Sequence, residues 1–403
     1  MGSMNEGRAN FRARMAKYYP RFSEGEYQRR YAAVRQGMSA AGIDVLVVHG
    51  GPGLGYHNQV NAHYLSNYVD QVATYVVFPL TGDPVQFVSI YPWLPMGEII
   101  SVINDVRVGS VREVGDVLKG YRNIRRVGVV GSGGIAKSIP HDHYEVLRQQ
   151  LPNADFVLAA DLLELVRHIP SAEELTWFSR GAELSDMAFR ALVDATRPGV
   201  ADYELFAAIH HSYLKEGGTF YFSWLGSTSM ADPVMPYPWS HPSGRRVQKG
   251  DVILMEVSAG YWGYAGQLQR VITLGEPSPL YQQLFALSRQ VYEEVSRALV
   301  AGTKLEALNT AAARIEQAGF TIQCPVVHGW GQRLTPPFCG IPGLQQWHSD
   351  PQTVLDENQL IVVEPNPCTP DLRAGVMLGN LNIVTRSGGR SLQKTPLDLV
   401  VLD

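Results

Sequence analysis

Two glutamate residues stand at the ends of strand-like apolar runs. Glu364 follows the apolar residues 360–363, and Glu256 follows the apolar residues 253–255. A carboxylate that points inward from a buried strand is costly unless it has a partner or holds a proton. We therefore expect both carboxyl groups to belong to a site, where they orient or polarise a substrate or pass a proton to a leaving group.

Two histidines are candidates for proton transfer. His241 lies in the segment Trp-Ser-His-Pro, and His328 begins the segment His-Gly-Trp-Gly. A neutral imidazole titrates near pH ~6.5 and accepts a proton at neutral pH, which aspartate and lysine do only after large pKa shifts. His241 is the predicted general base, against the alternative that it is a partly exposed loop histidine beside Pro242.

Polar side chains for substrate recognition are expected near these residues. Gln267 and Gln269 lie two positions apart, as on one face of a strand, and their amides can both donate and accept hydrogen bonds. Arg333 is a candidate for binding an anionic group of the substrate. An exposed loop arginine is an equal alternative at that position.

Three aromatic residues flank the candidate catalytic residues, namely Tyr237, Trp239 and Trp330. In most folds such side chains belong to the core or to an interface. Their place beside the histidines favours binding of a flat small molecule that is apolar or cationic.

The hydrophobic pattern predicts two domains. Residues 25–165 alternate helical spacing with apolar runs, as in an α/β domain, whereas long amphipathic helices and scattered strands follow from residue 173. The sequence Ser-Ala-Glu-Glu at 171–174 predicts a capping box at the start of the first long helix. We place the domains at residues 4–165 and 170–403 and expect the second to be α+β.

Composition excludes several classes of protein. The 403 residues are 45% hydrophobic, which excludes global disorder, and a formal net charge of −4 offers no general attraction to nucleic acid or to anionic lipid. No apolar run approaches the about 18 residues of a membrane span. Three cysteines without CxxC spacing fit a reducing compartment. We expect a soluble, cytoplasmic protein that acts on a small molecule.

The segment at residues 248–264 resembles the "GD-x-V-x-x-D-x-GA-x-Y-x-GY" motif of the creatinase, prolidase and methionine aminopeptidase superfamily. Further matching pieces follow in the family's order, at residues 171–175, 328–331, 362–365 and 375–385. The resemblance covers roughly residues 25–400 and implies a pita-bread catalytic domain after a smaller α/β creatinase-type domain.

The resemblance also implies where metal ligands would be. The peptidases of this superfamily bind two divalent ions through five side chains, and the matching positions here are Glu256, Gln267, His328, Glu364 and Gly379. Both bridging positions lack a charge, because one is the neutral Gln267 and the other is Gly379, so we expect no dinuclear centre and no cofactor. The alternative is one divalent ion held by His328 and Glu364.

These substitutions favour the creatinase-like branch. A second histidine of the peptidases is matched by Thr335. We therefore predict a metal-independent hydrolase of a C–N or related bond in a small non-peptide molecule. The alternatives are a lyase or decarboxylase, a prolidase-like or aminopeptidase-like metallohydrolase, and a non-catalytic binding protein.

The resemblance further implies a homodimer in which an amino-domain segment reaches the neighbouring active site. Residues 64–71 occupy that place in this chain.

Overall fold

The computed structural model describes residues 14–52, 56–121, 123–131, 137–341 and 347–403. The chain divides between Arg167 and His168 into two compact units. Within the described ranges, no helix combines the length and the apolar character needed to cross a bilayer.

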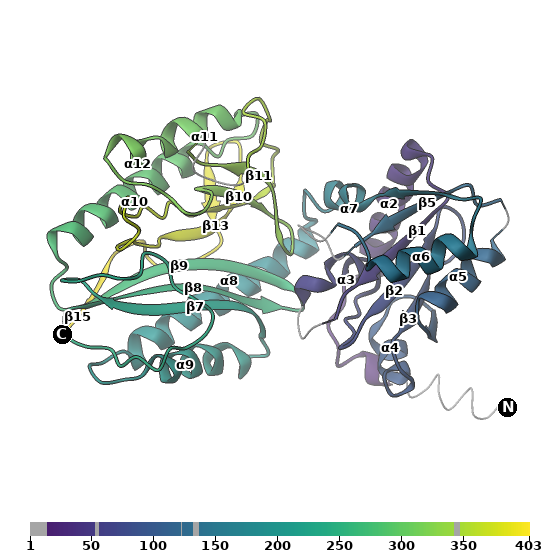
Figure 1. The fold of residues 1–403 in the computed structure, drawn as a ribbon, viewed down its shortest axis with the longest axis horizontal. Helices are drawn as coiled ribbons and strands as arrows, with labels where there is room; N and C mark the ends of the chain where they lie inside the picture. The colour runs from purple at the N-terminus through teal and green to yellow at the C-terminus, as the bar shows by residue number, and fades with distance from the viewer. Residues whose placement is uncertain (1–13, 53–55, 122, 132–136, 342–346) are drawn as a thin grey trace. The chain divides into compact units, whose positions relative to one another are not determined.

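The first unit contains a six-stranded sheet in the order β4-β3-β2-β1-β5-β6 (Figure 1). Strands β1, β5 and β6 are parallel, and β2 pairs with β1 in the antiparallel direction. The strands are β1 Val45–Gly50, β2 Thr74–Pro79, β3 Val85–Val88, β4 Asp105–Val108, β5 Arg126–Val130 and β6 Asp155–Leu158. The helices are α2 Glu24–Ala41, α3 Val60–Ser66, α4 Leu94–Ile100, α5 Val111–Gly120, α6 His141–Gln150 and α7 Ala160–Val166, with short 3₁₀ turns at Tyr56–Asn58 and Tyr91–Trp93.

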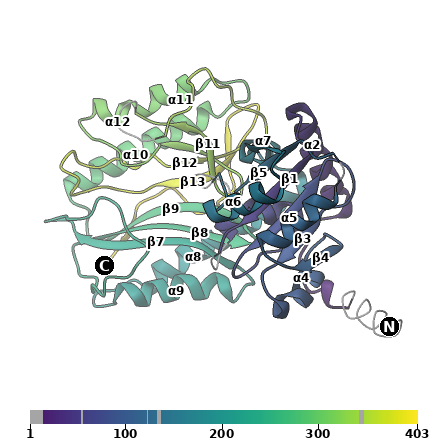
Figure 2. The same ribbon diagram turned by 45° about the vertical axis from the view of Figure 1, so that its right-hand side comes forward.

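Alternation along β1 explains why helices cover both faces of this sheet. Val45 and Val47 pack in one apolar cluster with residues of α5 and α6, whereas Leu46 and Val48 pack in another with residues of α2, α3 and α7. Successive side chains of a strand point to opposite faces, so a strand that is apolar throughout needs cover on both. Figure 2 shows α5 and α6 together on one side of the sheet.

The second unit is built on a larger sheet in the order β11-β10-β12-β13-β9-β8-β7, with β14 beside β13 and β15 beside β9. The strands are β7 Thr219–Ser229, β8 Asp251–Tyr261, β9 Tyr264–Leu274, β10 Val327–Trp330, β11 Leu334–Cys339, β12 Leu360–Val363, β13 Gly379–Val384, β14 Gly389–Ser391 and β15 Val400–Leu402. The helices are α8 Ala172–Ala195, α9 Asp202–Leu214, α10 Pro279–Ala298, α11 Leu305–Ala312 and α12 Arg314–Gln317.

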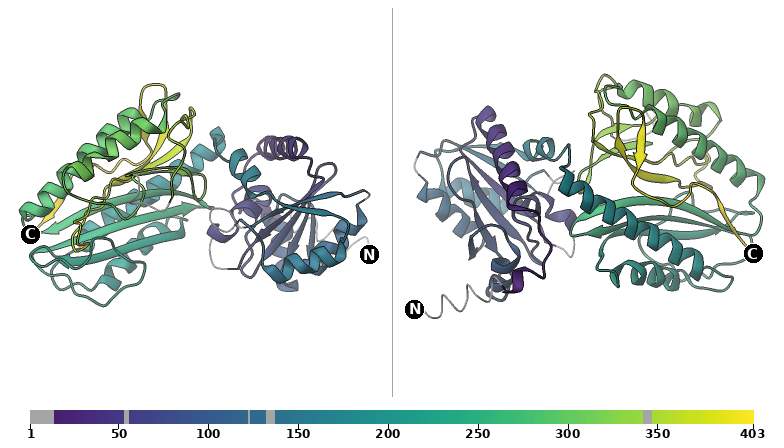
Figure 3. Two further views of the ribbon diagram at one scale, coloured as in Figure 1. Left: turned by 45° about the horizontal axis from the view of Figure 1, so that its top comes forward. Right: turned by 180° about the vertical axis from the view of Figure 1, so that it is seen from behind.

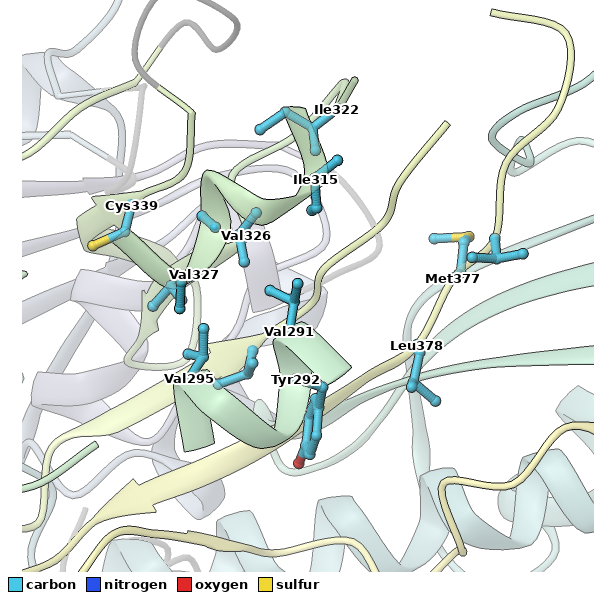
Figure 4. Packing of buried hydrophobic residues seen from close by; sticks show 14 of the residues in the cluster. Val291, Tyr292, Val295, Ile315, Ile322, Val326, Val327, Cys339, Met377 and Leu378 are labelled. Atoms are coloured by element: carbon cyan, nitrogen blue, oxygen red, sulfur yellow. The ribbon is translucent and has the colours of Figure 1, made fainter. Parts of the chain in front are cut away.

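Two helical layers cover the two halves of this sheet. Helices α8 and α9 share an apolar cluster with β7, β8 and β9, and Figure 3 shows α8 running along these strands. Helices α10, α11 and α12 share the other large cluster with β10, β12 and β13. In Figure 4, Val291 and Val295 of α10 lie in this second cluster with Val326 and Val327. Each half of the sheet is therefore supported by its own helical layer.

The structure confirms the predicted fold class, an α/β unit followed by an α+β unit. The capping box at α8 is present, since the Ser171 hydroxyl accepts from the Glu174 amide at 3.1 Å and the Glu174 carboxylate accepts from the Ser171 amide at 2.9 Å. The sequence pattern did not predict strand β7.

The predicted role of residues 64–71 in a neighbouring active site stays a prediction, and the structure shows how two of these side chains are used. Tyr64 is fully buried, and its ring lies 4.2 Å from the guanidinium carbon of Arg30. Tyr68 is also buried and donates to Asp70 at 3.2 Å. These two side chains are therefore used within their own unit.

Candidate active site

Strand register places the predicted site residues in one row. On adjacent strands, Trp224 of β7 pairs with Glu256 of β8, and Glu256 pairs with Gln269 of β9. Gln269 pairs in turn with Gly379 of β13. Directly paired residues project from the same face of a sheet, so these positions share the face between the helical layers. Gln267, two residues before Gln269, points to the same face.

Glu364 and His328 come from the other half of the sheet. Glu364 follows β12, and its amide donates to the Val326 carbonyl at 2.8 Å, which holds it beside β10. His328 of β10 pairs with Val362, so His328 and Glu364 share a face. The His328 Nε2 lies 3.3 Å from Glu364 Oε1.

Two glutamine amides connect the two glutamates. Gln267 Nε2 donates to Glu256 Oε1 at 2.8 Å and to Glu364 Oε2 at 2.7 Å. Gln269 Nε2 donates to Glu256 Oε2 at 2.8 Å and to Glu364 Oε2 at 2.7 Å. Each nitrogen therefore bridges both carboxyl groups. All four residues are buried, with 3% or less of their surface exposed.

Tyr237 completes the surroundings of Glu256. Its hydroxyl donates to Glu256 Oε2 at 2.8 Å, so Glu256 accepts three hydrogen bonds in all. Burial, together with the negative charge of Glu256, holds the pKa of Tyr237 well above its ordinary value. Tyr237 is therefore neutral and remains a donor.

The glutamate pair retains a proton near neutral pH. Burial, reinforced by the neighbouring charge of Glu364, raises the pKa of Glu256 to about 8. Two carboxylates this close in an apolar interior repel one another, and the proton relieves that repulsion. Because the groups titrate together, the proton belongs to the pair.

His328 adds to this proton network. Its Nδ1 lies 3.0 Å from the Gly329 carbonyl, which can only accept a hydrogen bond, so Nδ1 carries a hydrogen. Nε2 then faces Glu364 Oε1 at 3.3 Å. This contact places His328 among the polar groups that surround Glu364.

The residues present do not fit a pair of divalent ions. Gln267 and Gln269 point amide N–H groups at the carboxylates, where a cation would have to lie. Across the part of the chain that the structure describes, no three His, Cys, Asp or Glu side chains are grouped so as to hold a metal ion. A divalent ion needs several anionic or lone-pair donors, and amide hydrogens are not such donors.

Gly379 also lacks room for the missing ligand. A Cβ there would lie 2.9 Å from Gln269 Oε1 and 2.9 Å from the Val363 carbonyl. The Gln269 side chain thus fills the space into which a longer residue at this position would extend.

The remaining predicted residues lie outside this cluster. The side chain of His241 is exposed, its Nδ1 is 2.9 Å from Ser240 Oγ, and its ring stacks on Trp239 at 6.3 Å. The structure thus does not bring the predicted base to the buried carboxylates, because the loop directs it to the surface. Arg333 is half-buried in the connection between β10 and β11.

Trp330 is buried next to His328, with ring centroids 5.8 Å apart, and its Nε1 donates to the Ala265 carbonyl at 2.8 Å. Its indole hydrogen is therefore already used within the protein. This contact supports packing behind His328 as the role of Trp330.

A cavity of about 510 Å³ adjoins the cluster. Tyr237 connects the two, since it lines the cavity and donates to Glu256. The described residues that line the cavity are Trp224, Pro236, Tyr237, Pro238, Trp239, Gln323, Cys324 and Leu372.

Sequence reasoning overlooked Cys324 and gave Trp224 no particular role. The cross-strand pairing of Trp224 with Glu256 would have marked it, had the segment at Thr219–Ser229 been predicted as a strand. We find no signal in the sequence that marks Cys324.

Comparisons with known proteins settle the family. The family model described as "Metallopeptidase family M24" matches residues 177–386, and the model described as "Creatinase/Prolidase N-terminal domain" matches residues 30–169. The chain belongs to metallopeptidase family M24. This confirms the predicted creatinase and prolidase superfamily and its pita-bread fold, and the known members to which the chain is similar are hydrolases.

Relatives of known name support this assignment. The chain is 24% identical to an Xaa-Pro dipeptidase of Lactobacillus helveticus over 64% of this chain and 69% of that protein. It is 22% identical to a creatinase of Bacillus sp. over 94% of this chain and 93% of that protein. The crystal structure of the prolidase of Pyrococcus horikoshii superposes with a TM-score of 0.76 at 20% identity, over 92% of this chain and 99% of that one.

The predicted creatinase-like activity on a non-peptide C–N bond is wrong by these comparisons. Xaa-Pro dipeptidases and prolidases recur among the M24 relatives and the similar structures, whereas the creatinase is a distant relative. Lost metal ligands do not identify the substrate. Those positions determine how a bond is broken, and other contacts determine which molecule is bound.

The amide bridges predict that the purified protein retains no pair of divalent ions. After incubation with manganese, cobalt or zinc and removal of free metal, elemental analysis should find no stoichiometric pair on the wild-type chain. Gln267→Asp is the matched variant, because it replaces bridging N–H groups by a third carboxylate and should increase retained metal. Two equivalents of divalent metal bound by the wild-type protein would contradict the conclusion that these residues do not fit a pair of ions.

The raised pKa of Glu256 predicts a pH-dependent stability. Its folded pKa of about 8 exceeds the ordinary value of 4.5, so its stabilising contribution is complete below pH 4.5 and is lost as the pH rises toward 8. Glu256→Gln removes this titration. The melting temperature of the variant relative to wild type should therefore rise between about pH 5 and about pH 8.

The control for this measurement is Glu174→Gln. Glu174 is equally buried and also accepts from a tyrosine hydroxyl, that of Tyr264 at 3.1 Å, but lies outside the cluster. Its difference from wild type should stay flat over this pH range. A flat difference for Glu256→Gln would show that Glu256 is ionised throughout.

Proposed function

We propose that this M24 protein hydrolyses the amide bond of a small peptide-like substrate, with the Glu256–Glu364 pair moving the protons. The observation that supports this most is the buried carboxyl pair, which two glutamine amides bridge beside a cavity of small-molecule size. Burial raises the pKa of Glu256, which favours a proton on the pair. The Xaa-Pro dipeptidases among the relatives support a short peptide as the substrate class.

The pair can supply both proton transfers of amide hydrolysis. The carboxylate takes a proton from water as the water oxygen bonds to the carbonyl carbon, and the carboxyl group gives its proton to the nitrogen as the C–N bond breaks. The products share the elements of one water molecule, and the pair ends with the single proton it began with. This logic resembles that of other acid pairs whose members cannot both ionise.

The surrounding groups keep this pair ready for use. The amides of Gln267 and Gln269 hold both carboxyl groups in place, and His328 orients the second oxygen of Glu364. Since all of these side chains are buried, they require little rearrangement when a substrate binds. No step in this scheme uses a metal ion, in keeping with the proposal that the protein needs no cofactor. The homodimer implied by the sequence resemblance stays a prediction.

Replacing either glutamate should abolish hydrolysis. We expect Glu256→Gln and Glu364→Gln to lower the rate of cleavage of Xaa-Pro dipeptides by about two to four orders of magnitude, as for the loss of a general acid or base. Released amino acids are measured by mass spectrometry, with Glu174→Gln as the control that keeps its rate. Transfer of ¹⁸O from water to the product carboxylate would distinguish hydrolysis from elimination.

Three results would contradict the proposal. One is the absence of cleavage across a panel of dipeptides and dipeptide amides, which would favour a non-catalytic binding protein. Another is activity that appears only with added divalent metal. A third is full activity in both glutamine variants.

The two histidines should differ sharply in how much their replacement by alanine lowers turnover. His328→Ala removes the partner of Glu364, and we expect a loss of about 100-fold or more in turnover. His241→Ala should stay within a few-fold of wild type, because its side chain is exposed and stacks on Trp239. Steady-state kinetics with the best dipeptide measures both. The opposite order, with His241→Ala inactive, would restore His241 as the base.

A further inference from the structure

The cavity beside the carboxyl pair has an aromatic wall. Trp224 and Trp239 stack with ring centroids 6.4 Å apart and an interplanar angle of 19°, and Tyr237 meets Trp224 edge-on at 5.3 Å. All three line the cavity. Trp239 is 65% exposed, although most tryptophan side chains are largely buried. Together the three rings form a contiguous aromatic patch in the cavity lining, which is a feature of ligand-binding surfaces.

The cavity lining that the structure describes carries no positive charge. Among the described lining residues there is no lysine, arginine or histidine. With one proton for two carboxyl groups, the Glu256–Glu364 pair carries one negative charge, and Tyr237 links it to the cavity wall. The pKa of Cys324, which also lines the cavity, is held well above its ordinary value by burial and then by the charge of Glu364. The described lining therefore offers an anionic group no charged partner.

We propose that the wall of Trp224, Tyr237 and Trp239 binds the cationic group of the substrate, either a protonated amine or a quaternary ammonium. Indole faces attract cations through their quadrupole, and the buried negative charge strengthens this attraction. A cavity of about 510 Å³ has room for such a group together with an adjacent amide bond. The inference rests on the proposed function for the identity of the substrate, and it adds the charge that the substrate must carry.

The test compares two probes of the same shape, choline and 3,3-dimethyl-1-butanol, which differ in the charge of one central atom. Titration calorimetry with the full chain should show choline binding at least about tenfold tighter than the neutral alcohol. Trp239→Leu keeps an apolar side chain but removes the aromatic face. It should reduce this preference to within about twofold while changing the affinity for the neutral alcohol little.

Tyr203→Leu is the matched control, because Tyr203 is an exposed aromatic residue of the same unit, on α9, and does not line the cavity. It should keep the full preference for choline. Equal affinity for both probes, no binding of either, or an unchanged preference in Trp239→Leu would each overturn the proposal.

The outcome is separable from that of the proposed function, because these probes contain no amide bond and binding is measured without turnover. A choline preference without any dipeptide cleavage would sustain the cation site and remove the hydrolase. Cleavage that depends on both glutamates, without a choline preference, would sustain the hydrolase and remove the cation site.

Discussion

The hydrogen bonds from Gln267 and Gln269 to both Glu256 and Glu364 are the interaction on which the site depends. Two carboxylates buried side by side are unstable unless something positive or a proton lies between them. In the M24 relatives that bind metals, cations would have this role. In this chain four hydrogen bonds from the amides, together with one proton, stabilise the two carboxyl groups instead. The buried acid pair therefore persists without bridging carboxylates.

Strand packing sets the positions of these amides. Both glutamines project from β9, and α8 lies against this strand through close backbone approach. A Cβ at Gly181 would come within 2.4 Å of the Tyr264 carbonyl, and one at Gly266 within 2.4 Å of the Ala182 Cα. Larger residues at either glycine would push the helix away from β9. The chemistry of the site and the packing of the helical layer are therefore coupled through a single strand.

Much of this site was predictable from sequence. Glu256 and Glu364 each follow a run of apolar strand residues, and the resemblance to M24 proteins located Gln267, His328 and Gly379. Pairing across strands was not predictable, because the register depends on the whole sheet. The bridging of both glutamates by one amide nitrogen and the filling of the Gly379 position by Gln269 thus became visible only in three dimensions. The exposure of His241 was not predictable for a related reason, since position in the sequence does not say whether a loop side chain turns inward.

If Glu256 and Glu364 share one proton near neutral pH, carbon-13 NMR of glutamate-labelled protein will detect it. One glutamate δ-carbon signal should titrate near pH 8, be absent from Glu256→Gln, and move to lower pH in Glu364→Gln because the neighbouring charge is gone. If every glutamate signal in the wild-type protein completed its titration below about pH 6, both carboxyl groups would be ionised at neutral pH and the shared proton would not exist.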